Sequence, residues 1–157
     1  MGQQQLLLVI LVTIIVGIAT VVAINIFGQA ADHANRDAVR QDLLAGIATA
    51  QALWERPAAM GGFGQAFPTA IDIRRLNIPR GSDLTLQYDE TTIENDNGTY
   101  TIIGNTDTVL ELQGEPASGG ENITVKLERI AATATDPARW AITWDGEGEE
   151  EGGDTAL

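Results

Sequence analysis

The stretch LLLVILVTIIVGIATVVAINIF occupies residues 6–27 of this 157-residue chain. Its 22 residues include no charge and no proline, and sixteen of them are Leu, Ile, Val or Phe. A helix rises about 1.5 Å per residue, so the stretch is about 33 Å long as a helix, enough to cross a hydrocarbon core of about 30 Å. The sequence therefore predicts a helix that enters a membrane or an equally dry protein assembly.

A cleaved signal peptide is an alternative interpretation of this stretch. Residues 1–5 contain no Lys or Arg, so the basic start of a signal peptide is missing. The apolar run is also longer than the usual core of about 7 to 15 residues. Ala30 and Ala31 resemble a cleavage site, which keeps this alternative open.

The charge of the chain lies entirely after Phe27. The formal net charge is −13, carried by the remaining residues, which number about 130 and suit one domain. Such an acidic surface repels nucleic acid, so we expect no nucleic-acid partner. The short neutral amino terminus opposite a large acidic domain predicts a membrane-inserted form with the amino terminus inside and the domain outside. The absence of cysteine excludes disulfides and thiolate chemistry.

Beyond residue 27 the helical period continues while the polarity changes. Val39, Leu43, Ile47, Ala50 and Trp54 recur at steps of three and four, which is the apolar stripe of an amphipathic helix. We therefore predict one helix over about residues 3–54, ended by the proline at position 57.

The following segment, residues 58–81, is rich in glycine and proline and predicts a loop with a short helical turn over about residues 69–76. It contains too many apolar residues for a solvated linker, so we expect it to pack on the domain. Those residues are Met60, Phe63, Phe67, Ile71, Ile73, Leu76 and Ile78.

From residue 83 onward the apolar period becomes two, which predicts strands with one buried face. The alternating residues are Leu84, Leu86 and Tyr88; Tyr100 and Ile102; Leu110 and Leu112; Ile123, Val125 and Leu127; and Trp140, Ile142 and Trp144. Turn residues separate the segments, with Asn97-Gly98 as the strongest hairpin signal.

The fold class predicted is α+β, with a long amino-terminal helix packed on a carboxy-terminal antiparallel sheet. The helix is apolar over residues 1–28 and amphipathic over residues 29–56. The loop and the sheet form a head over residues 57–144, and residues 145–157 form a flexible acidic tail.

Few residues suggest chemistry. We expect the single histidine, His33, to be an exposed residue of the helix rather than a catalytic base or a metal ligand. The acidic loops lack the spacing of a calcium-binding loop. We predict no catalytic, cofactor-binding or metal site and no enzyme activity. Asn97 and Asn122 begin glycosylation sequons, which a hairpin turn and chance also explain.

Gly2, the polar residues Gln3, Gln4 and Gln5, the apolar run from Leu6 and the predicted architecture together resemble a type IV pilin or type II secretion pseudopilin. The resemblance implies a homopolymer whose apolar helices form the filament core and whose heads form the outer wall. It also implies an inner-membrane precursor, pilus assembly machinery as a partner, and an extracellular filament on the cell surface. The expected core residues are Leu6, Leu7, Leu8, Ile10, Leu11, Ile14, Ile15, Ile18, Val21 and Val22.

The start of the chain departs from the family pattern. Gln3 stands where the family usually has Phe, and Leu7 stands where it usually has the Glu that pairs with a neighbouring amino terminus. Only Met1 precedes Gly2 in this sequence, so we expect that the chain is not processed by the usual route. We predict instead that Gln3, Gln4 and Gln5 form a polar cluster with neighbouring subunits.

The structural filament subunit is the function that the sequence favours. A minor pilin or pseudopilin of a secretion or uptake machine is the first alternative. A solitary membrane-anchored binding domain is the second, and an enzyme ranks last.

Overall fold

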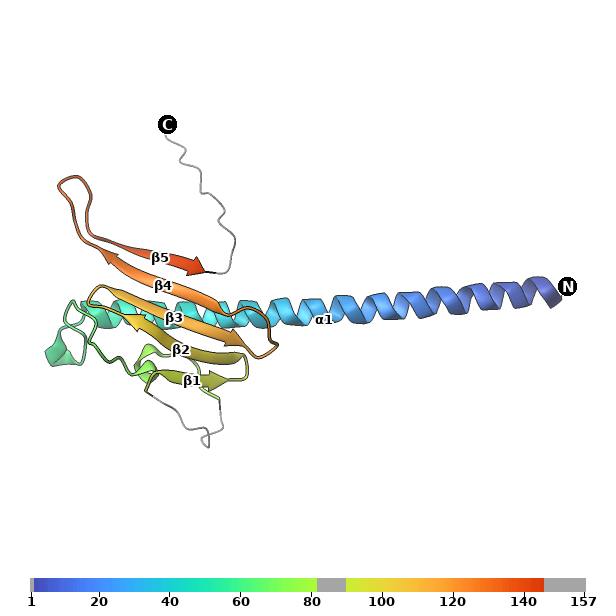
Figure 1. Ribbon diagram of the computed structural model, residues 1–157, viewed down its shortest axis with the longest axis horizontal. Helices are drawn as coiled ribbons and strands as arrows, with labels where there is room; N and C mark the ends of the chain where they lie inside the picture. The colour runs from blue at the N-terminus through green and yellow to red at the C-terminus, as the bar shows by residue number, and fades with distance from the viewer. Residues whose placement is uncertain (1, 82–89, 146–157) are drawn as a thin grey trace. The chain divides into compact units, whose positions relative to one another are not determined.

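The computed structural model of the chain describes residues 2–81 and 90–145. Within them, one long helix precedes a five-stranded antiparallel sheet, so the predicted α+β fold class is confirmed (Figure 1). The elements are α1 (Gly2–Glu55), the 3-10 helices η1 (Ala58–Met60) and η2 (Ile73–Leu76), and the strands β1 (Thr92–Asn95), β2 (Gly98–Asn105), β3 (Val109–Pro116), β4 (Ile123–Ile130) and β5 (Arg139–Asp145).

The chain divides into two compact units, Met1–Ala34 and Asn35–Leu157. The first unit, as far as it is described, is the part of α1 from Gly2 to Ala34. The second unit, called the head below, contains the rest of α1, the segment of residues 58–81 and the sheet.

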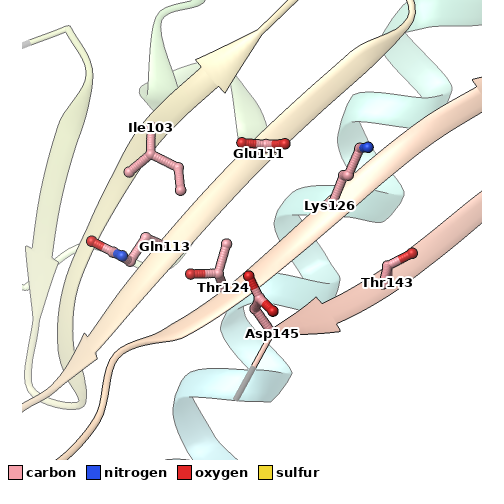
Figure 2. A pocket seen from close by; sticks show the side chains of 7 residues that line it. All are labelled: Ile103, Glu111, Gln113, Thr124, Lys126, Thr143 and Asp145. Atoms are coloured by element: carbon pink, nitrogen blue, oxygen red, sulfur yellow. The ribbon is translucent and has the colours of Figure 1, made fainter. Parts of the chain in front are cut away.

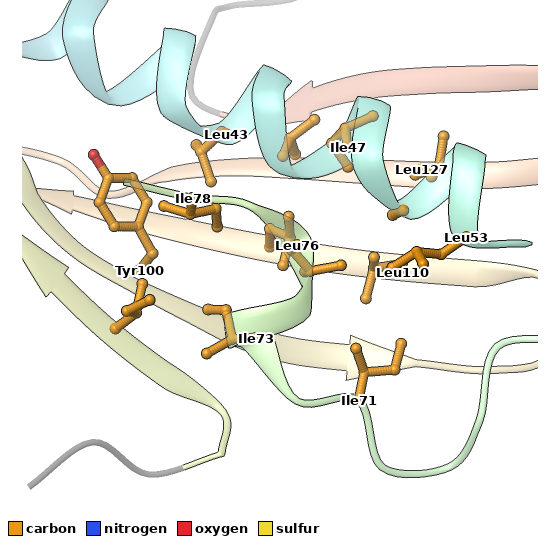
Figure 3. Close-up of a cluster of buried hydrophobic side chains, with 14 of the residues drawn as sticks. Leu43, Ile47, Leu53, Ile71, Ile73, Leu76, Ile78, Tyr100, Leu110 and Leu127 are labelled. Carbon is orange, nitrogen blue, oxygen red and sulfur yellow. The ribbon is translucent and has the colours of Figure 1, made fainter. Parts of the chain in front are cut away.

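The core of the head forms between the predicted stripe of α1 and one face of the sheet. All five stripe residues are buried, from Val39 at 0% exposure to Trp54 at 8%. Leu110 and Leu127 meet them from β3 and β4, and Leu76 from η2 (Figure 3). The amphipathic pattern of residues 39–54 therefore predicted its contacts correctly.

The segment of residues 58–81 packs on the head, as predicted. Its buried residues are Phe67, Ile71, Ile73, Leu76 and Ile78, and Phe63 packs partly against them. The prediction for Met60 was wrong, because its side chain is 72% exposed. Met60 closes η1, where its backbone N–H binds the carbonyl of Pro57 at 2.9 Å and Gly61 adopts φ 79°. That tight turn directs the Met60 side chain outward.

The short turn predicted over residues 69–76 corresponds to η2 (Ile73–Leu76). Asp72 caps it, since the Asp72 carboxylate accepts a hydrogen bond from the Arg74 backbone N–H at 2.9 Å. The Arg74 side chain also binds this carboxylate and lowers the pKa of Asp72. The cap places Ile73 and Leu76 in the core.

The five strands follow one another in space in the order β1-β2-β3-β4-β5, and every neighbouring pair is antiparallel. The alternating pattern did not predict β1, a strand of only four residues. Ile93 of β1 is fully buried. The strand predicted on Leu84, Leu86 and Tyr88 lies outside the described residues.

Strand β5 corrects two predictions. Ile142 is 43% exposed rather than buried, because β5 is the last strand in the sheet order and has a neighbour on one side only. Asp145 belongs to β5 and pairs with Thr124, so the sheet extends one residue beyond the predicted head. The rest of the predicted tail, residues 146–157, lies outside the described residues.

The hairpin signal at Asn97-Gly98 is confirmed with a shift of one residue. Asn95 pairs with Gly98, so the two turn residues are Asp96 and Asn97. Gly98 is required by close packing, because a Cβ atom there would lie 2.1 Å from the backbone oxygen of Glu115.

Candidate assembly surface

The ten residues predicted for the filament core all lie on α1 and are exposed in the single chain. Their exposed fractions run from 48% for Ile10 to 68% for Leu7. A contiguous apolar surface of this kind is rare on soluble monomers and marks a membrane or protein contact. Full burial of each such side chain would contribute about 1.5 to 3 kcal/mol to the free energy of membrane insertion or association. This surface is therefore the strongest candidate for an interaction site.

The hydroxyl groups within this surface are satisfied by the helix itself. Thr13 Oγ1 donates to the carbonyl of Ile10, and Thr20 Oγ1 donates to the carbonyl of Val16, both at 2.8 Å. A hydroxyl bonded to its own helix needs no water, which lowers the cost of placing it in an apolar medium. The two threonines are thus compatible with a dry environment.

By length and composition, α1 is the one helix in the described part of the chain that is long and apolar enough to cross a membrane. A signal sequence near the amino terminus meets the same two criteria.

The three glutamines predicted to form a polar cluster occupy the first turn of α1 and are exposed. No acidic residue lies in that turn. The first N–H groups of a helix have no partner within the helix, and glutamine side chains can accept hydrogen bonds from such groups. The cluster with neighbouring subunits stays a prediction.

A second arrangement, which the sequence did not indicate, joins α1 to the β1–β2 hairpin of the head. Asp42 Oδ2 accepts hydrogen bonds from Asn95 Nδ2 at 2.9 Å, from Asn97 Nδ2 at 2.9 Å and from Tyr100 Oη at 2.6 Å. We call these four residues the Asp42 clamp. The available signal was the position of Asp42 beside Leu43 of the buried stripe, where an acid requires donors from the facing strands.

Burial and the carboxylate of Asp42 both raise the pKa of the Tyr100 phenol. Each acts in the same direction, because a buried phenolate is poorly solvated and a neighbouring carboxylate repels it. Tyr100 therefore stays protonated in the folded head and serves as a donor to Asp42.

Asn35 extends the contact between α1 and the turns of the sheet. Its Nδ2 donates to the carbonyl of Asn97 at 2.9 Å. Its Oδ1 accepts from the backbone N–H of Ser118 at 3.2 Å and from Ser118 Oγ at 3.0 Å. One asparagine of the helix thus holds both the β1–β2 turn and the β3–β4 connection.

Aromatic residues close the opposite end of the head core, at the carboxyl end of α1. The rings of Trp54 and Trp140 meet edge to face with centroids 5.1 Å apart. The Arg129 guanidinium lies 5.2 Å from the Trp54 ring and 5.1 Å from the Trp140 ring. This cation–π contact links β4 to both α1 and β5.

The two predicted glycosylation residues differ in access. A glycan attaches through the amide nitrogen, and Asn97 Nδ2 is held by the Asp42 carboxylate. Asn122 is exposed immediately before β4. The geometry favours Asn122, and modification of either residue stays a prediction.

The outer face of the sheet, opposite α1, contains a hollow of about 380 Å³ (Figure 2). Its polar lining comes from strand positions that alternate with core residues, so it is the solvent face of the sheet. Lys126 there pairs with Glu128 at 3.3 Å. His33 is exposed on α1, and the described residues contain no group of three potential metal ligands.

No protein-family model, curated protein or solved structure matches this chain. The exposed apolar surface of α1 is the feature that most needs a partner.

Proposed function

We propose that this protein is the structural subunit of a type IV pilin-like extracellular filament, which polymerises through the apolar residues 6–27 of α1. The observation that carries the proposal is that a helical surface, apolar on all sides and exposed in the single chain, belongs to the same helix as the core stripe of the head. Before assembly the apolar helix is inserted in the inner membrane, and the head lies outside.

The continuity of α1 supports a filament over a solitary membrane anchor. An anchor needs only an apolar stretch and tolerates a flexible linker before its domain. In this chain α1 extends from Gly2 to Glu55 as one element, and buried core residues begin at Val39. One helix therefore carries both the apolar stretch and the core stripe of the head, which a solitary anchor does not require.

The distribution of charge supports contacts between the apolar helices as the main source of cohesion. All charged residues follow Phe27, and acids outnumber bases by 22 to 9. Heads of one sign repel each other at close range, although salt screens this repulsion over about 10 Å. The apolar stretch carries no charge and therefore no such repulsion, and burial of any of its sides is favourable.

Electron microscopy of material sheared from the cell surface, with mass spectrometry of the same fraction, tests the proposal. We expect fibres in which this chain is the most abundant protein. Fibres that contain it only as a trace component would indicate the minor pilin role. A chain found only in the membrane fraction, with no fibres, would overturn the proposal in favour of a solitary anchor.

A further inference from the structure

Asn97 of the Asp42 clamp begins the one Asn-Gly sequence in the chain, Asn97-Gly98. Asparagine followed by glycine is the pair most prone to deamidation, because glycine has no side chain to obstruct the approach of its backbone nitrogen. That nitrogen loses its proton and attacks Cγ of Asn97, so a C–N bond forms and the Cγ–Nδ2 bond breaks. Ammonia leaves, and water then opens the cyclic imide to aspartate or isoaspartate.

Both reacting groups are engaged in hydrogen bonds in the folded head. The leaving nitrogen, Asn97 Nδ2, donates to the Asp42 carboxylate at 2.9 Å. The attacking nitrogen, that of Gly98, donates its proton to Asn95 Oδ1 at 3.1 Å. The negative charge of Asp42 also opposes the anionic nitrogen and the anionic intermediate that the reaction requires.

The backbone around the reacting pair is held as well. The Asn97 carbonyl accepts hydrogen bonds from Asn35 Nδ2 at 2.9 Å and from the Ala117 N–H at 2.8 Å. Gly98 is buried against Glu115, so closely that a Cβ would not fit. Ring closure needs rotation about these backbone bonds, and the contacts prevent it.

We propose that Asn97 is a latent deamidation site, closed while α1 holds the β1–β2 hairpin and reactive when the hairpin leaves the helix. The reaction is one-way in its structural effect. Deamidation replaces the Asn97 amide donor with a carboxylate opposite Asp42, and two carboxylates at hydrogen-bonding distance repel each other. A head that has opened and reacted cannot re-form the clamp, so the modification records past opening. This inference does not depend on the filament.

The rate of deamidation in the full chain tests the proposal. The chain in detergent is incubated at mildly alkaline pH, and the peptide that contains Asn97 is followed by mass spectrometry for conversion of amide to acid. If only the open state reacts, the deamidation rate of the folded protein is proportional to the fraction of molecules that are open. We therefore expect the folded chain to deamidate at least about tenfold more slowly than the chain in urea. Equal rates would overturn the proposal.

Substitutions in α1 test the role of the clamp. Asp42→Ala should accelerate deamidation of the folded protein, and Asp37→Ala should not. Asp37 is the matched control because its side chain lies on the same helix and is 74% exposed. A folded Asp42→Ala variant that reacts no faster than the Asp37→Ala variant would overturn the proposal. If Asp42→Ala does not fold, the milder Asn35→Ala variant takes its place under the same criterion.

Exchange of the acidic and amide side chains between positions 42 and 97 tests whether a reacted head fails to re-form the clamp. Asn97→Asp mimics the reacted site and should lower the midpoint of thermal unfolding more than Asn97→Ala does. The double variant Asp42→Asn with Asn97→Asp places a donor opposite the new carboxylate and should recover part of the loss. A loss no greater for Asn97→Asp than for Asn97→Ala would contradict the repulsion that prevents the clamp from re-forming.

Discussion

Tyr100 Oη lies 2.6 Å from Asp42 Oδ2, although the two residues are 58 positions apart in the sequence. Tyr100 is fully buried in β2, and Asp42 lies on α1 beside the core stripe. This hydrogen bond joins the helix to the sheet at the end of the head where the two hairpin asparagines also bind Asp42. Loss of this hydrogen bond should therefore weaken the contact between the helix and the sheet.

The alkaline stability of the head should depend on Tyr100. Its folded-state pKa is raised above the ordinary value of 10.0, so its contribution is complete below about pH 10 and decreases as the pH rises further. The free energy of unfolding should fall by up to about 1.4 kcal/mol per pH unit above that value. Chemical unfolding of the wild type and of Tyr100→Phe at several alkaline pH values measures this decrease.

Tyr100→Phe should also lower the stability near neutral pH by about 1 to 3 kcal/mol, because Asp42 loses a donor. Above pH 10 the difference between the two proteins should shrink, since only the wild type retains a titrating phenol at this position. A difference that stays constant from neutral to alkaline pH would contradict the assignment.

Gly114 of β3, which packs against α1, should not tolerate a larger residue. A Cβ atom at this position would lie 2.6 Å from Val39 Cγ1, a buried atom of the helix. Gly114→Ala should therefore destabilise the head by about 1 to 3 kcal/mol through overpacking. Gly104→Ala is the matched control, because its Cβ would meet only the Glu111 side chain, whose nearest atom, Oε2, would lie 3.1 Å away. Thermal unfolding of both variants should show the larger loss for Gly114→Ala.

Arg129 should contribute to stability through its two tryptophan contacts. Arg129→Gln removes the cation from the faces of Trp54 and Trp140 and should cost about 0.5 to 2 kcal/mol. Lys126→Gln on the same strand removes an exposed charge and should cost little. Denaturant unfolding followed by tryptophan fluorescence compares them, and equal losses would show that the ring contacts add nothing.

The three amino-terminal glutamines should matter for assembly and not for the head. Replacing Gln3, Gln4 and Gln5 together with alanine removes the amide groups that we expect to bind neighbouring subunits, each hydrogen bond contributing about 1 kcal/mol. The fibres should disassemble at a lower temperature, while the unfolding midpoint of the head stays unchanged. Fibres of unaltered thermal stability would show that no such cluster forms.

Periodicity predicted most of the fold because each apolar pattern had a single partner to bury it. The steps from Val39 to Trp54 identified one helix face, and the alternation around Val125 identified one sheet face. Ile93 was missed because β1 is only four residues long and Ile93 is its one apolar residue, so no alternation is visible. Ile142 was misjudged because its alternation does not reveal that β5 ends the strand order.

The polar contacts of the head were beyond what the sequence could predict. The partners of Asp42 lie more than 50 positions away, and no local spacing connects them. Asn97-Gly98 indicated a hairpin but not the helix that the hairpin binds. By contrast, the composition of residues 6–27 alone predicted a helix suited to an apolar environment.

Assembly of the Ile15→Lys variant tests the filament proposal most directly. Ile15 lies in the middle of the apolar stretch, where an unpaired ammonium in a dry core costs about 3 kcal/mol or more per subunit. Met60→Lys is the control, because it places the same charge on an exposed position of the head. Electron microscopy of sheared surface material should show no fibres for Ile15→Lys and normal fibres for Met60→Lys, with both heads folded. Normal fibres from Ile15→Lys would contradict assembly through the apolar helix.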